Sequence, residues 1–217
     1  MGYLGICIGV IATLELILAA ILFKRYMRTK RPLTLCVLLI CIGLFIDAFL
    51  IAMGGPTGGL PEGISRIRFF AHGGLIPLLF PICGYGLKAK KQAMTILWIF
   101  TAAVIVLGIA HAAVLVLEPL TLGNVVRHTM GASTPMWARI VSSALSFGTV
   151  IPLIICGIII WIRQKNPHLF LSGILMFGFA ALGPAIGKMD LIFFITMFGE
   201  LFMILFALFY IMKDEKG

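Results

Sequence analysis

The sequence predicts an all-α integral membrane protein with seven transmembrane helices, its N-terminus outside and its C-terminus in the cytoplasm. Of the 217 residues, 61% are hydrophobic and only 12% are charged, about half the charged share of an average soluble domain. Mean hydropathy is +1.14. A soluble domain of this size could not hide so much apolar surface, because much of any folded chain stays exposed. The composition therefore excludes soluble enzymes, nucleic-acid-binding proteins and disordered proteins.

Seven apolar stretches are long enough to cross the hydrocarbon core, which takes about 20 residues of helix. We place them at 2–23, 33–53, 66–87, 93–117, 137–161, 169–187 and 190–212. The first has no basic segment before it, so we expect a retained helix and not a signal peptide. The third contains Pro77 and Pro81 and is predicted to be kinked. The sixth is short and forms a tight hairpin with the seventh. No linker divides residues 1–217, which predicts one transmembrane domain.

The orientation follows from the lysines and arginines that lie between the spans. Twelve of them fall in the segments after the first, third, fifth and seventh spans, and five fall on the other side. Cytoplasmic loops carry the excess of basic residues, so the N-terminus is predicted to be outside, in the inner (cell) membrane. The net charge of +9 is thereby explained without an acidic partner such as nucleic acid. We expect these basic loops to contact anionic lipid headgroups.

Two outside loops interrupt the helical pattern. Residues 54–65 are rich in glycine and proline, which predicts a non-helical, flexible lid. Residues 118–136 form the longest loop, for which we expect a short helix lying at the membrane interface. The five cysteines all lie within spans and form no CxxC motif, so neither a disulfide framework nor a thiol-redox site is expected.

Five ionisable side chains lie inside the apolar layer: Glu15, Asp47, His72, His111 and Glu200. Each costs about 2.5–3.5 kcal/mol on insertion scales, so such groups usually face the interior of the bundle and mark functional sites. A rise of 1.5 Å per residue places three of them, Asp47, His72 and His111, in one layer near the outside. Glu200 and Glu15 fall near the midplane, where they are predicted to share a proton.

Further polar side chains are predicted to line the same outer half. Arg66 and Arg68 would cap the layer from above, and Arg68 follows Arg66 by only two residues. Ser142 and Ser146 lie four residues apart on the fifth span and therefore share one face of it. Together these groups predict a polar cavity that opens to the outside and is closed toward the cytoplasm.

Three functions fit such a cavity. We favour a protein that binds or transports a small ligand, cationic or coupled to protons, since acids at two depths and helices broken by proline are typical of transporters. A chain this short would favour transport as a homodimer. The alternative is an enzyme, a zinc-dependent intramembrane lipid hydrolase in which Asp47, His72 and His111 hold the metal. In a third reading, His72 and His111 are the axial ligands of a single haem b. A fourth interpretation is purely structural, with His72 and Asp47 simply paired inside the bundle.

Overall fold

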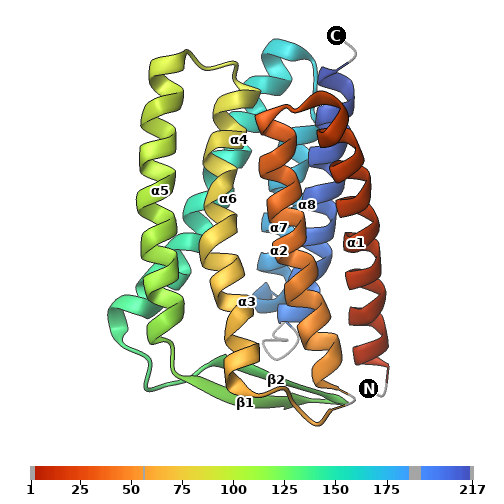
Figure 1. Ribbon diagram of the computed structural model, residues 1–217, viewed down its shortest axis with the longest axis vertical. Coiled ribbons are helices and arrows are strands. Elements are labelled where there is room, and N and C mark those ends of the chain that lie inside the picture. Colours follow the sequence, from red (N-terminus) through yellow and green to blue (C-terminus); the bar gives the residue numbers. More distant parts are fainter. Residues whose placement is uncertain (1–2, 56, 186–191, 216–217) are drawn as a thin grey trace.

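The computed structural model describes residues 3–55, 57–185 and 192–215 and shows a bundle of helices with a β-hairpin across one end (Figure 1). The helices are α1 (Leu4–Thr29), α2 (Pro32–Gly54), α3 (Glu62–Leu75), α4 (Leu79–Gly86), α5 (Lys91–Val114), α6 (Met136–Gln164), α7 (His168–Ala185) and α8 (Ile192–Asp214). A short 3-10 helix, η1 (Ile76–Leu78), joins α3 to α4. The prediction of an all-α bundle of apolar helices is confirmed.

Six described segments are long and apolar enough to cross a membrane. They are α1, α2, the continuous stretch from α3 to α4, α5, α6 and α8. The sixth predicted span corresponds to α7, whose apolar part, His168–Leu182, is shorter. The connection between the sixth and seventh predicted spans falls on residues 186–191, which lie outside the described residues.

The third span is interrupted where the prolines predicted a kink. Pro77 lies in η1, where the backbone leaves the α-helical pattern because proline has no N–H to donate and its ring crowds the preceding turn. Helix α3 begins at Glu62, earlier than predicted, directly after Pro61. The acidic Glu62 in its first turn favours this start, because a helix N-terminus stabilises negative charge.

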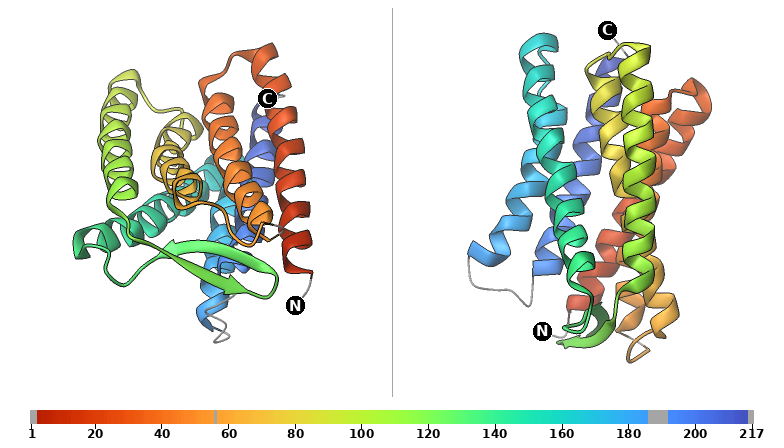
Figure 2. Two further views of the ribbon diagram at one scale, coloured as in Figure 1. Left: turned by 60° about the horizontal axis from the view of Figure 1, so that its bottom comes forward. Right: turned by 90° about the vertical axis from the view of Figure 1, so that its left-hand side faces the viewer.

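The segment 118–136, predicted to be a long outside loop, contains strands, and the prediction of a short helix there is wrong. Strand β1 (Leu117–Leu122) pairs antiparallel with β2 (Val125–Met130). The two-residue turn Gly123-Asn124 explains the hairpin, since Gly123 adopts φ 61°, a left-handed conformation that favours glycine. Figure 2 shows the hairpin lying across the end of the bundle that carries the N-terminus. There Asn124 Oδ1 accepts a hydrogen bond from the backbone N–H of Gly5 (3.3 Å).

The C-terminal end of α2 and the residue that follows it also pack on this hairpin. A Cβ added at Gly54 would collide with the carbonyl oxygen of Val126, and one at Gly55 would lie 2.9 Å from that of Asn124. Gly54 and Gly55 of the predicted lid therefore lie against the hairpin, and the prediction that 54–65 is wholly non-helical is wrong, because residues 62–65 form the first turn of α3. The C-terminus and the basic connections α1–α2, α4–α5 and α6–α7 lie at the opposite end (Figure 1).

Helices α3 and α5 touch through two glycines. A Cβ added at Gly73 would lie 2.5 Å from the carbonyl oxygen of Gly108, so the two backbones are in direct contact there. Small residues allow this close approach of helices in lipid.

Replacing Gly73 by alanine is expected to lower the free energy of unfolding by about 1–3 kcal/mol, because the added methyl group overpacks the α3–α5 contact. Gly74 is the matched control, since no atom lies within 4 Å of a Cβ added there. Thermal unfolding of the purified protein in detergent measures both variants. Equal midpoints for Gly73→Ala and Gly74→Ala would contradict the close contact.

Helix α6 runs at a slant across the back of the bundle (Figure 1). Toward the C-terminal end of the bundle it packs tightly on α7, where Gly157 faces the backbone of Phe170 and Gly173 faces Ile154. Nearer the hairpin end, residues of α6 and α7 line a cavity between them and the rest of the bundle.

Candidate functional site

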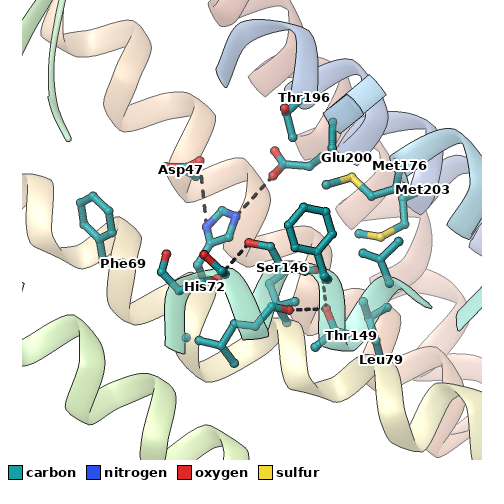
Figure 3. Close-up of a pocket in the computed structure, with 18 of the residues that line it drawn as sticks. Asp47, Phe69, His72, Leu79, Ser146, Thr149, Met176, Thr196, Glu200 and Met203 are labelled. Atoms are coloured by element: carbon teal, nitrogen blue, oxygen red, sulfur yellow. Dashed lines mark hydrogen bonds and ion pairs between the residues drawn. The ribbon is translucent and has the colours of Figure 1, made fainter. Parts of the chain in front are cut away.

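A cavity of about 440 Å³ lies in the half of the bundle nearer the hairpin (Figure 3). Its wall is mostly apolar and aromatic, with polar groups from five helices. The lining polar residues are Asp47, Arg68, His72, His111, Ser142, Ser143, Ser146, Thr149, Thr196 and Glu200. A predominantly apolar cavity with a few converging polar groups is the usual form of a small-molecule site.

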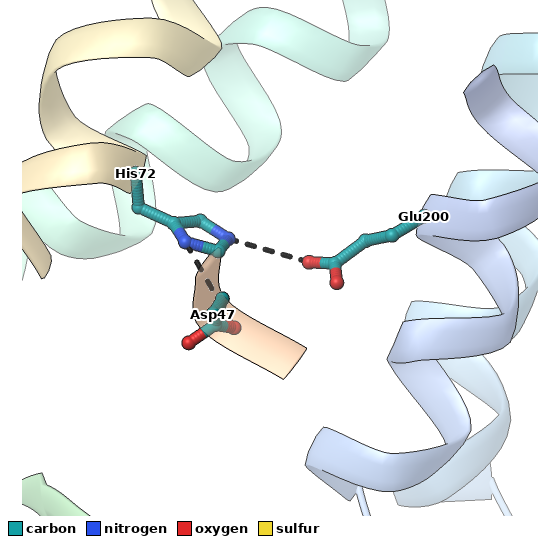
Figure 4. A group of neighbouring side chains, drawn as sticks. All are labelled: Asp47, His72 and Glu200. Atoms are coloured by element: carbon teal, nitrogen blue, oxygen red, sulfur yellow. Dashed lines mark hydrogen bonds and ion pairs between the residues drawn. The ribbon is translucent and has the colours of Figure 1, made fainter. Parts of the chain in front are cut away.

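Three of these groups meet at one side of the cavity, and we call them the acid–His cluster: Asp47 of α2, His72 of α3 and Glu200 of α8. Figure 4 shows the imidazole lying between the two carboxylates. His72 Nε2 lies 3.3 Å from Glu200 Oε1, and His72 Nδ1 lies 4.0 Å from Asp47 Oδ2. Both acids are buried, with 6% of Asp47 and 7% of Glu200 exposed, whereas 37% of the His72 side chain is exposed.

Asp47 has a second partner in Arg68. Arg68 Nε donates a hydrogen bond to Asp47 Oδ1, and the whole arginine is only 8% exposed. Its Nη1 donates to the backbone carbonyl of His128 in β2 (3.3 Å). The ion pair therefore connects α2 to α3, and Arg68 also connects them to the hairpin. A buried pair of this kind needs such added hydrogen bonds to offset the desolvation of its charges.

Among the four groups Asp47, Glu200, Arg68 and His72, the charges are equal in number when His72 is protonated. Asp47 and Glu200 each contribute one negative charge as carboxylates, and Arg68 contributes one positive charge. A neutral imidazole has one N–H, whereas an imidazolium carries an N–H on each ring nitrogen, one beside Glu200 at 3.3 Å and one toward Asp47 at 4.0 Å. One imidazole therefore lies within reach of two carboxylates, and only its protonated form presents an N–H to each of them.

The hairpin brings a further cation toward this site. The Arg127 guanidinium lies over the ring of Phe193, 4.0 Å from its centroid. Burial, together with the positive charge of Arg68, lowers the pKa of Arg127 to about 10, although Asp47 opposes that shift. Beside it, His128 Nδ1 lies 3.0 Å from Ser65 Oγ. Arg127 was not among the site residues predicted from the sequence.

Arg66 and Arg68 have separate roles in the structure. Arg66 Nη1 donates to the carbonyls of Ala112 (3.0 Å) and Leu115 (2.8 Å) at the end of α5. Its Nη2 pairs with Glu62 at 2.5 Å. Arg66 therefore satisfies the free carbonyls at a helix C-terminus, and it is not among the residues that line the cavity.

His111 lies in the cavity wall, but the structure does not bring it into the acid–His cluster. Its two ring nitrogens are buried and have no hydrogen-bond partner among the described residues. The metal-ligand group predicted from helical depth was Asp47, His72 and His111, whereas the group with close ligand atoms contains Glu200 in place of His111. The position of His72 also weighs against a haem b held by His72 and His111. His72 already faces two acids, and Gly73 packs directly on Gly108.

The predicted serine stripe of α6 forms part of the cavity wall. Ser146 Oγ donates to the carbonyl of Ser142 (3.1 Å), and Ser143 Oγ lies 3.3 Å from the carbonyl of Arg139. These hydroxyls are satisfied within their own helix, yet each oxygen can still accept a hydrogen bond. The α6 serines therefore add polar groups to the cavity wall.

Glu15 and Glu200 do not form the hydrogen-bonded pair that we expected at the midplane. Glu200 contacts His72, and neither carboxylate oxygen of Glu15 has a hydrogen-bond partner among the described residues. Glu15 is also absent from the cavity lining.

The sequence matches no protein-family model and no curated protein. The geometry of the site therefore carries the functional argument.

Proposed function

We propose that this polytopic membrane protein binds a small lipophilic cation in its cavity and releases a proton in exchange. The observation that carries the proposal is the position of His72 between Asp47 and Glu200 in the wall of a cavity of about 440 Å³. An imidazole held there can give up its proton when another positive charge arrives.

The exchange follows from repulsion between positive charges at the site. With His72 protonated, Arg68 and His72 face the two carboxylates, and Arg127 adds a further positive charge nearby. A cation that enters the cavity beside Glu200 increases the positive charge at low dielectric, where like charges repel strongly. Loss of the His72 proton relieves this repulsion, so cation and proton compete for Glu200.

The rest of the cavity suits a lipophilic cation. Aromatic rings of Phe69, Phe147 and Phe177 and the thioethers of Met176 and Met203 line it. Ring faces attract cations, especially where water is excluded, and methionine adapts to irregular apolar ligands. Apolar contacts would then supply affinity, and the acid–His cluster would select for positive charge.

The direction of access follows from the distribution of basic residues. The connections rich in lysine and arginine lie at the C-terminal end of the bundle (Figure 1), which supports a cytoplasmic position for that end. The cavity would then be reached from outside or from the outer lipid layer. The break at η1 and Pro152 inside α6 support a bundle that flexes around its ligand, as a transporter requires.

Equilibrium dialysis with tetraphenylphosphonium tests the proposal. This aromatic cation carries no titratable proton, and tetraphenylborate has the same shape with the opposite charge. We expect saturable binding of the cation, weaker binding at lower pH, and no saturable binding of the anion, with empty detergent micelles as the blank. Equal binding of both ions would contradict a cation site.

A zinc-dependent hydrolase is the second candidate, favoured by one observation. One ligand atom from each of Asp47, His72 and Glu200 lies within 4.8 Å of the others, and carboxylate oxygens and imidazole nitrogens are both zinc ligands. The two acids contact opposite nitrogens of the ring, however, and Arg68 already neutralises Asp47. Stoichiometric zinc in the purified protein would favour this candidate over cation exchange.

A further inference from the structure

Glu15 lies on α1 at nearly the same depth as Glu200. One turn before it, Ile11 belongs to an apolar cluster that includes Met197. One turn after it, Leu18 belongs to a second apolar cluster that includes Met203. Glu15 therefore falls between the two clusters, at the level of the middle of the 197–203 segment of α8.

In the part of the chain that the structure describes, the Glu15 carboxyl group has no hydrogen-bond partner and no salt bridge. The residue is 0% exposed, and both carboxylate oxygens lack a hydrogen-bond partner among the described residues. The Cys41 thiol donates to the backbone carbonyl of Glu15 and not to its side chain (3.3 Å). Glu200 of α8 and Asp47 of α2 lie near enough to act on it electrostatically, and both are acids.

An ionised carboxylate in this place would be costly. Taking one charge out of water costs several kcal/mol even after the protein relaxes, and the two neighbouring acids add repulsion. Arg68 cannot offset this cost directly, because it is engaged by Asp47. A neutral carboxylic acid avoids both the desolvation cost and the repulsion from the neighbouring acids.

We infer that Glu15 is a second proton-binding site, a neutral carboxylic acid sealed in the core behind the acid–His cluster. It holds its proton under conditions in which His72 exchanges one with the cavity. Its coupling to the cavity rests on the proposed function, because a cation bound beside Glu200 would reduce the negative field at Glu15 and thereby shift the vibration of its C=O bond. Its protonation at neutral pH does not rest on that function.

Infrared spectroscopy of the purified protein tests the inference. At neutral pH we expect a carboxylic-acid C=O band, separate from the amide and carboxylate bands, that disappears in Glu15→Gln and remains in Glu200→Gln. Glu15→Asp serves as the second variant and should keep a band at a shifted frequency. Size-exclusion elution identical to that of the wild type shows that each variant is folded.

The outcomes separate the two proposals. A wild-type protein without the band, or a band unchanged in folded Glu15→Gln, would overturn the protonation of Glu15. If tetraphenylphosphonium binds but leaves the band unmoved, the coupling to the cavity is overturned while the proton site stands. If the cation does not bind at all, the proposed function fails, and the band still decides whether Glu15 holds a proton.

Discussion

Replacing Glu200 by glutamine is expected to weaken tetraphenylphosphonium binding by about 30-fold or more, since removing one partner of a buried charge pair costs about 2–5 kcal/mol. With glutamine at this position, Asp47 and Arg68 balance each other and a neutral His72 completes an uncharged site. No negative charge then remains for the cation to neutralise. Equilibrium dialysis in detergent measures the change in Kd.

Glu62→Gln is the matched control for this variant. Glu62 lies at the start of α3, its side chain is 54% exposed, and it pairs with Arg66 outside the cavity. We expect its Kd to equal that of the wild type. A Glu200→Gln protein that binds the cation as tightly as the Glu62→Gln protein would remove Glu200 from the site.

Replacing His72 by glutamine is expected to abolish the pH dependence of cation binding. In the wild type, competition between one proton and one cation should change Kd by up to about tenfold per pH unit while the free protein holds the proton. Glutamine can still donate a hydrogen bond to Glu200 but cannot carry the proton. Between pH 6 and 8 its Kd should therefore stay nearly constant, at the tight value that the wild type reaches at high pH.

His128→Gln controls for the loss of an imidazole elsewhere. His128 lies in β2 and its ring contacts Ser65, so the wild-type pH dependence should persist in this variant. If Kd changes with pH in His72→Gln as it does in the wild type, another group exchanges the proton.

The fold was largely predictable because burial in lipid leaves a strong signal. Each span needs about 20 apolar residues, and the structure places helices at all seven predicted stretches, with the seventh beginning beyond the undescribed residues. Pro77 also located the break in the third span. The hairpin was missed although its signal was present, since Gly123-Asn124 between valine- and threonine-containing segments is typical of a tight turn.

The site was predictable only in part, because helical rise gives depth but neither the rotation nor the tilt of a helix. Depth alone placed His111 in the same layer as Asp47. It placed Glu200 in a deeper layer. In the structure Glu200 reaches His72, whereas His111 faces the cavity without a partner among the described residues. The pairing of Arg68 with Asp47 likewise depends on which faces α2 and α3 present to each other, which no spacing within one helix reveals.

The most direct test of proton exchange is to count the protons released when tetraphenylphosphonium binds. The purified protein is titrated with the cation at pH 7 in weakly buffered detergent solution, and a pH indicator records the release. We predict about one proton per bound cation in the wild type and none in His72→Gln. Saturable binding without proton release in the wild type would contradict the exchange.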